Sequence, residues 1–189
     1  MAISKKTGTI IMGLFIISLM VGSLITFGEF GNPNDDSSRY EYNGYVFAQM
    51  QNGWAVYKDG QTIALRYGAK DLETYDVKIT SIDSLNLLEK VYFSTDPRDS
   101  IRNAVYDFDY NIQLNARIVP ACTVDIEACK DVPLKTCDDA DDNTGVIIFK
   151  NSNDTTVTFD RNCLVVEGSP DEIVKVTDKL VLNLKGVTT

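Results

Sequence analysis

The sequence predicts an α+β or α/β domain that stands outside the cell behind one N-terminal transmembrane helix. Three observations predict this arrangement. An uncharged apolar run occupies residues 7–28, short aromatic and β-branched segments follow it, and the rest of the chain alternates strand-like and helix-like patterns. We therefore expect an antiparallel β-meander packed with a mixed-sheet α/β unit that carries two main helices.

The apolar run is long enough to cross a bilayer, since about 20 helical residues span a hydrocarbon core of about 30 Å. Lys5 and Lys6 precede it, and all 27 acidic residues follow it. Basic flanks stay on the cytoplasmic side, so we expect a single-pass protein of the cell membrane, with residues 1–6 inside and the C-terminal domain extracytoplasmic. The alternative is a cleaved signal peptide, but its apolar region is typically about 7–15 residues long. Residues 29–38 predict a linker.

Composition excludes several classes of function. The chain carries a net charge of -9, which disfavours nucleic-acid binding. It contains no histidine, and this excludes His-dependent nucleophilic catalysis and His-containing zinc sites. We expect no cofactor and identify no catalytic residue. The expected partners are the bilayer, through residues 7–28, and other membrane or surface proteins; self-association through Ser18 and Gly22 is a further hypothesis.

Residues 39–80 predict the β-meander. Asn-Gly and Asp-Gly pairs, which favour tight hairpin turns, separate its apolar segments. We expect four strands, at 40–42, 45–51, 54–58 and 61–66, and a further short strand at 77–79. The aromatic stripe on these strands indicates core packing rather than a ligand platform.

Residues 81–189 predict the disulfide-linked α/β unit. A strand at 91–95 is followed by Asp96-Pro97, which is typical of a helix N-cap and first turn. The strand at 116–121 should pair in parallel with it through the intervening helix. That helix is predicted from apolar side chains at helical spacing: Ile101, Ala104, Val105, Phe108 and Ile112.

The remaining elements are three strands and a second helix. The strands are expected at 146–149, 156–159 and 163–167. Ser169, Pro170 and Glu172 form a capping-box pattern that predicts a helix start, and Gly186 predicts its end. Its apolar stripe contains Ile173, Val176, Leu180, Val181 and Leu184.

All four cysteines follow the apolar run, on the side where thiols oxidise. Four cysteines allow three pairings, and the sequence does not choose among them rigorously. We favour Cys122–Cys129, which are near neighbours, and Cys137–Cys163, which would tie a loop to a core strand. A four-cysteine zinc site is the weaker alternative, because no Cys-x-x-Cys motif is present.

Two further sites are suggested by local patterns. Asp138, Asp139, Asp141 and Asp142 are calcium candidates, although their spacing lacks the glycine and glutamate of an EF-hand loop, and a solvated acidic loop is the favoured interpretation. Asn153 begins an Asn-Asp-Thr sequon and is a candidate glycosylation site.

Several segments carry a resemblance. They are VYFSTDP at 91–97, PAC at 120–122, NCLVVEG at 162–168 and DKLVLNLKGV at 178–187. The chain resembles uncharacterised single-span, signal-anchored extracytoplasmic proteins of archaea, in which a similar C-terminal segment recurs. The resemblance implies the domain layout and the four-cysteine pattern, and it implies no mechanism.

These observations lead to three hypotheses about function. The first is a non-enzymatic, membrane-tethered subunit, structural or partner-binding, of a cell-surface or envelope assembly. The second is an extracytoplasmic enzyme or accessory subunit that uses paired carboxylates. The third is a calcium-dependent adhesion module.

Overall fold

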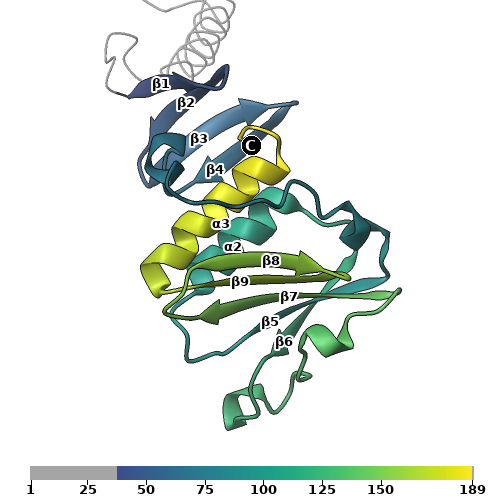
Figure 1. Cartoon of the computed structure of the whole chain (residues 1–189). Coiled ribbons are helices and arrows are strands. Elements are labelled where there is room, and N and C mark those ends of the chain that lie inside the picture. Colours follow the sequence, from purple (N-terminus) through teal and green to yellow (C-terminus); the bar gives the residue numbers. More distant parts are fainter. Residues whose placement is uncertain (1–37, 189) are drawn as a thin grey trace, which may run out of the picture. The chain divides into compact units, whose positions relative to one another are not determined.

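The computed structural model describes residues 38–188, and these form an α+β structure with three layers (Figure 1). A four-stranded antiparallel sheet and a five-stranded mixed sheet enclose a layer that contains two helices. No helix among residues 38–188 is long and apolar enough to cross a membrane. The predicted span at 7–28, the segment 1–6 and the linker up to residue 37 lie outside the described residues.

The four-stranded sheet confirms the predicted meander. Its strands are β1 (Arg39–Tyr42), β2 (Tyr45–Met50), β3 (Gly53–Lys58) and β4 (Gln61–Leu65), paired antiparallel in chain order. Asn43 and Gly44 have φ angles of 51° and 79°, and Asp59 and Gly60 have 50° and 82°. Two consecutive positive φ angles define the type I′ turn that matches the twist of the strands it joins, so the Asn-Gly and Asp-Gly pairs explain both outer hairpins.

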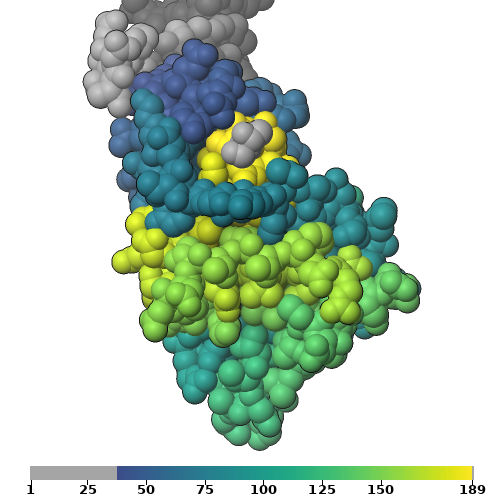
Figure 2. All heavy atoms as spheres, in the orientation of Figure 1, coloured from purple at the N-terminus to yellow at the C-terminus, as the bar shows by residue number. Residues whose placement is uncertain are grey.

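The segment after β4 contains 3-10 helices at Ala69–Leu72 and Asp83–Leu87, and the strand predicted at 77–79 is wrong. Val77 is buried, but its carbonyl oxygen accepts a hydrogen bond from the Asn183 side chain instead of a neighbouring strand. The residues between the two 3-10 helices cross over the C-terminal helix, and Figure 2 shows them as a belt on its surface. Residues 77–79 therefore cover the C-terminal helix and do not pair with a strand.

The five-stranded sheet has the order β6-β5-β7-β9-β8. Parallel pairing of β5 with β6 across helix α2 is confirmed; β7 also runs parallel to β5, on its other side. β9 is parallel to β7, and the edge strand β8 is antiparallel to β9. The bounds are β5 (Lys90–Thr95), β6 (Arg117–Cys122), β7 (Thr144–Asn151), β8 (Thr156–Asp160) and β9 (Cys163–Gly168).

Helix α2 (Arg102–Ile112) presents the predicted stripe to the core, but the predicted start at Asp96-Pro97 is wrong. Asp96 accepts hydrogen bonds from the backbone and the guanidinium group of Arg98. The Asp99 backbone N–H donates to the Asp96 carbonyl oxygen, 3.0 Å away. Asp96 therefore stabilises a turn over residues 96–99 instead of capping a helix, and α2 begins at Arg102.

Helix α3 (Pro170–Leu184) starts at Pro170 as predicted, but the capping box at Ser169 is absent. The Glu172 carboxylate binds the Tyr75 hydroxyl and the Lys175 ammonium group, so it does not reach back to Ser169. Gly186, with a φ angle of 64°, follows the helix end as expected. Nine of its fifteen residues are buried, including three polar ones besides Lys179, because both sheets and the belt surround it.

One hydrophobic core joins the two sheets through these helices. It contains Phe47, Val56 and Ile63 from the four-stranded sheet and Ile147 and Phe149 from β7. The segments 39–80 and 81–189 thus share a core, and residues 39–189 form one compact unit.

Candidate interaction surface

The outer face of the four-stranded sheet is the candidate functional surface. Strand register defines it, because alternate side chains point to opposite faces. Arg39, Ala48, Ala55 and Ala64 are paired in one row across all four strands. The outer face consists of this row together with Glu41, Val46, Met50, Gly53, Tyr57 and Thr62.

Apolar side chains on this face are exposed. Val46 is 57% exposed, Met50 50% and Tyr57 69%. The alanine row between them has no side chain beyond Cβ, so the centre of the face is flat. Single exposed apolar residues are ordinary on a protein surface, but a group of them on one sheet face is typical of an interaction site.

Charge distribution separates this sheet from the rest of the domain. Residues 39–66 carry three basic and two acidic side chains, whereas residues 67–189 carry 13 basic and 22 acidic ones. On the outer face itself, Arg39 and Glu41 are the only charged residues that the strands β1–β4 place there. The outer face, with its exposed apolar side chains, therefore also carries few acids.

Aromatic side chains pack against one another on the inner face of the four-stranded sheet. The rings of Tyr40 and Phe47 stack with centroids 5.1 Å apart, and Trp54 meets Tyr40 edge-on at 4.9 Å. Such pairs contribute about 0.5–1.5 kcal/mol beyond the area that they bury. The predicted packing of the aromatic stripe in the core is confirmed for these residues. The opposite face of the sheet is therefore formed by other side chains.

Helix α2 covers the backbone edge of β4. The Asn111 side-chain oxygen accepts the Ala64 N–H at 2.9 Å, and its amide nitrogen donates to the Ala64 carbonyl oxygen at 2.8 Å. These two bonds replace part of a neighbouring strand, which protects a sheet edge from pairing with another chain. Beside this edge, Tyr106 and Tyr110 of α2 stack with centroids 6.4 Å apart and are 65% and 51% exposed.

A buried carboxylate joins the end of β4 to α3. Asp178 is fully buried, and its Oδ2 atom accepts the backbone N–H groups of Arg66 and Tyr67 at 2.9 Å each. Its Oδ1 atom has no hydrogen-bond partner. Burial raises the pKa of Asp178 to about 7, against the lowering effect of the two N–H donors. Arg66 itself forms an ion pair with Asp107 of α2.

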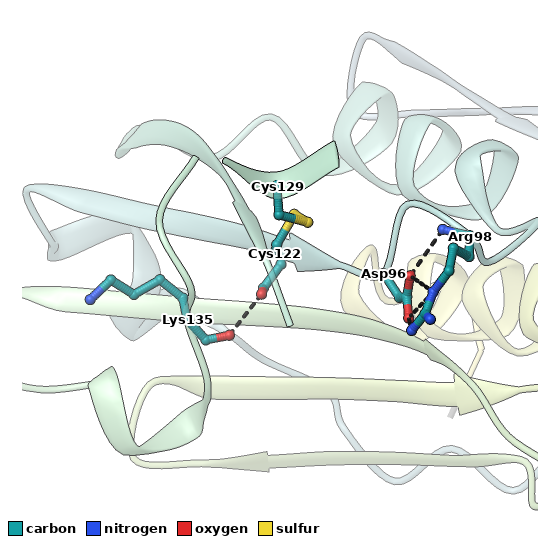
Figure 3. The surroundings of a disulfide bond; sticks show 6 residues. Asp96, Arg98, Cys122, Cys129 and Lys135 are labelled. Atoms are coloured by element: carbon teal, nitrogen blue, oxygen red, sulfur yellow. Dashed lines mark hydrogen bonds and ion pairs between the residues drawn. A yellow bond between two sulfur atoms is a disulfide. The ribbon is translucent and has the colours of Figure 1, made fainter. Parts of the chain in front are cut away.

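The carboxyl ends of β5 and β7 form a second candidate location for a functional site. After β5 the chain forms β6 on one side of that strand and then β7 on its other side. Open α/β sheets often bind ligands at such a reversal of strand order. A hollow of about 240 Å³ there is lined by residues that include Asp96 and Asp99. Both carboxylates already have partners. Arg98 binds Asp96 (Figure 3), and Asp99 accepts the Asn151 N–H at 3.0 Å. Arg98 also lowers the pKa of Asp96.

The cysteines form the two favoured disulfides, Cys122–Cys129 and Cys137–Cys163. Figure 3 shows the first of them near the end of β6. The segment 123–143 connects β6 to β7, and its residues Lys135 and Ala140 contact the face of the five-stranded sheet that is turned away from the helices. Lys135 holds this segment in place, because its backbone pairs with Cys122 and its carbonyl oxygen accepts the Ser94 hydroxyl at 2.7 Å.

The four calcium candidates do not converge. The Asp139 carboxylate binds Lys135, which lowers its pKa, and Asp141 accepts the Asn143 N–H, which lowers the pKa of Asp141. Asp138 lines a separate surface hollow beside Cys137, and Asp142 is exposed. Among residues 38–188, no group of three or more acidic, cysteine or histidine side chains is arranged to hold a metal ion.

Asn153 is exposed in the loop between β7 and β8, so its side chain is accessible. The sequence reasoning missed the outer face itself. The signal was present in the alternation of β2 and β3, in which Val46, Ala48 and Tyr57, rather than polar side chains, occupy the positions opposite the core. Comparison with known proteins adds no relative, since no family model, curated protein or solved structure matches this chain.

Proposed function

We propose that this chain is a membrane-tethered extracytoplasmic protein that acts as a partner-binding subunit of a cell-surface assembly. The observation that carries the proposal is the outer face of the four-stranded sheet, which is apolar, flat and nearly free of acids in an otherwise acidic domain. Exposed patches of this kind mark sites of protein association. The uncharged run at 7–28 would supply the tether, and Lys5 and Lys6 its orientation.

The two disulfides support the extracytoplasmic location. Disulfides persist in oxidising compartments and are rare in the cytosol. Both pairs involve segment 123–143 or its ends, which contains only two short 3-10 helices and no strand of its own. Such a segment depends on covalent ties, which require an oxidising environment to form.

Location is tested with one added thiol. All four native cysteines are in disulfides, so Leu87→Cys, at a position that is 87% exposed, would be the one free thiol of the chain. A membrane-impermeant maleimide should label this variant in intact cells. Labelling only after lysis, together with free native thiols, would place the domain in the cytosol and contradict the proposed location.

Partner binding is tested by photo-crosslinking of the full chain in native membranes. A photoreactive amino acid at position 57, on the outer face, should give discrete crosslinked products. The same amino acid at position 87 is the matched control, since Leu87 is also exposed and apolar but lies outside the face. Equal products from both positions, or none from position 57, would overturn the assignment of this face.

A further inference from the structure

The outer face has the properties of a surface that meets a second copy of the same chain. We propose that two copies associate face to face through their four-stranded sheets, around a two-fold axis near Ala55. This inference rests on the proposed function, since it names the partner that the outer face binds.

Charge favours the face-to-face orientation over other orientations of two copies of this chain. Residues 67–189 carry an excess of nine acidic groups, so two copies repel each other wherever these parts approach. Residues 39–66 carry one more basic than acidic group. Apposition of the two sheets places the acidic parts at opposite ends of the pair, and it is the arrangement with the least repulsion.

Shape supports the same arrangement. Two sheets pack face to face about 10 Å apart when their side chains interdigitate. Ala48, Ala55 and Ala64 form a shallow row across the centre, and Val46, Met50 and Tyr57 project beside it. In a two-fold arrangement the same patch serves both partners, so the projecting side chains of one copy would cover the alanine row of the other.

Area sets the strength of this contact. Four strands about 4.8 Å apart and about 20 Å long give a face on the order of 400 Å². A stable interface buries about 800 Å² on each partner, so the face alone supports a weak dimer. Tethering both copies to one membrane would raise their effective concentration and populate the pair.

The experiment uses the full chain with Ala55→Cys in lipid vesicles. A residue near a two-fold axis lies close to its own copy, so a short bismaleimide should convert the variant to a covalent dimer. Leu87→Cys is the control for random collisions. We expect at least a ten-fold higher dimer yield from position 55 than from position 87 at the same lipid-to-protein ratio. Because the dimer is weak, the yield from position 55 should fall when lipid is added to dilute the protein several-fold.

A second variant tests whether the sheet face causes the proximity. Tyr57→Lys in the Ala55→Cys background adds like charge to both copies and should reduce the dimer yield to that of the Leu87→Cys control. Equal yields from positions 55 and 87 in vesicles would overturn the proposal. If position 55 then crosslinks to a different protein in native membranes, the proposed function stands without the self-pairing; if it crosslinks to nothing, both fail.

Discussion

The two sheets each bury one face against the helices α2 and α3, but their other faces differ. In the five-stranded sheet, part of segment 123–143 lies on the far face, where Ala140 packs against Val146, Ile148 and Cys163. In the four-stranded sheet, no other part of residues 38–188 plays that role for the row Ala48, Ala55 and Ala64. The comparison shows that the chain itself closes part of one outer sheet face and leaves the other exposed, and that the closing segment is held by two disulfides.

Substitutions at two neighbouring residues of β2 should differ most in their effect on the free energy of unfolding. Phe47 is fully buried and Val46 is 57% exposed, on opposite faces of the strand. Phe47→Ala should lower the free energy of unfolding by about 3–5 kcal/mol, because it leaves a cavity in the shared core. Val46→Ala should change it by less than about 0.5 kcal/mol. Denaturant unfolding measures both, and a large loss for Val46→Ala would mean that the outer face is covered within the monomer.

The link between the four-stranded sheet and α3 should depend on pH. The folded pKa of Asp178, about 7, lies above its ordinary value of 3.8, so the folded state binds this proton more tightly. The contribution of Asp178 to stability is therefore complete below about pH 4 and decreases by up to about 4 kcal/mol as pH rises to 7. Asp178→Asn should remove that slope from the pH profile of the unfolding free energy.

Asp139 gives a control of opposite sign for this measurement. Its pKa is lowered by Lys135, so its contribution to stability is present above its ordinary pKa and is lost as pH falls. Asp139→Asn should flatten the profile in acid and leave the slope between pH 4 and 7 unchanged. If Asp178→Asn left that slope unchanged as well, the buried carboxylate would not titrate as the structure implies.

The stabilising effect of each disulfide should increase with the length of the chain loop that it closes. Cys137 and Cys163 are 26 residues apart and Cys122 and Cys129 are 7 apart. Replacing each pair by serine should cost about 3.5 and about 2.5 kcal/mol respectively, in the chain-entropy estimate. Thermal unfolding of the two double variants checks the order. The reverse order would show that the Cys122–Cys129 disulfide stabilises the domain more than the Cys137–Cys163 disulfide does.

Loss of the edge protection of β4 should lower stability by less than the loss of either disulfide. Asn111→Ala removes both hydrogen bonds to Ala64 and should cost about 1–2 kcal/mol. It should also raise the tendency to aggregate, because it exposes the N–H and C=O groups of an edge strand. Light scattering at equal fractions folded, with Asn103→Ala at an exposed position of α2 as control, separates the two effects.

Local patterns predicted most of the secondary structure, since each pattern has a local cause. The hairpins follow from Asn43-Gly44 and Asp59-Gly60, and α2 follows from a stripe that includes Ala104 and Phe108. The failures occurred where a distant residue competes for the same group. Asn183 takes the Val77 carbonyl oxygen, and Tyr75 takes the Glu172 carboxylate that would have completed the cap at Ser169.

The candidate surface was harder to predict than the fold. Alternation in β2 and β3 assigns residues to two faces, but it does not say which face is core when both carry apolar side chains. The buried role of Asp178 could not be predicted either, because its donors Arg66 and Tyr67 are more than a hundred residues away in the chain.

Helix α3 lies at the centre of the domain, yet it is translated after every strand of both sheets. During synthesis, therefore, nine strands emerge before the helix that they enclose. Until residues 170–184 arrive, α2 covers only part of the inner faces of the two sheets, and the nascent chain is prone to aggregation in that interval. A chaperone that shields hydrophobic strands would accordingly matter most for this protein before residues 170–184 have been translated.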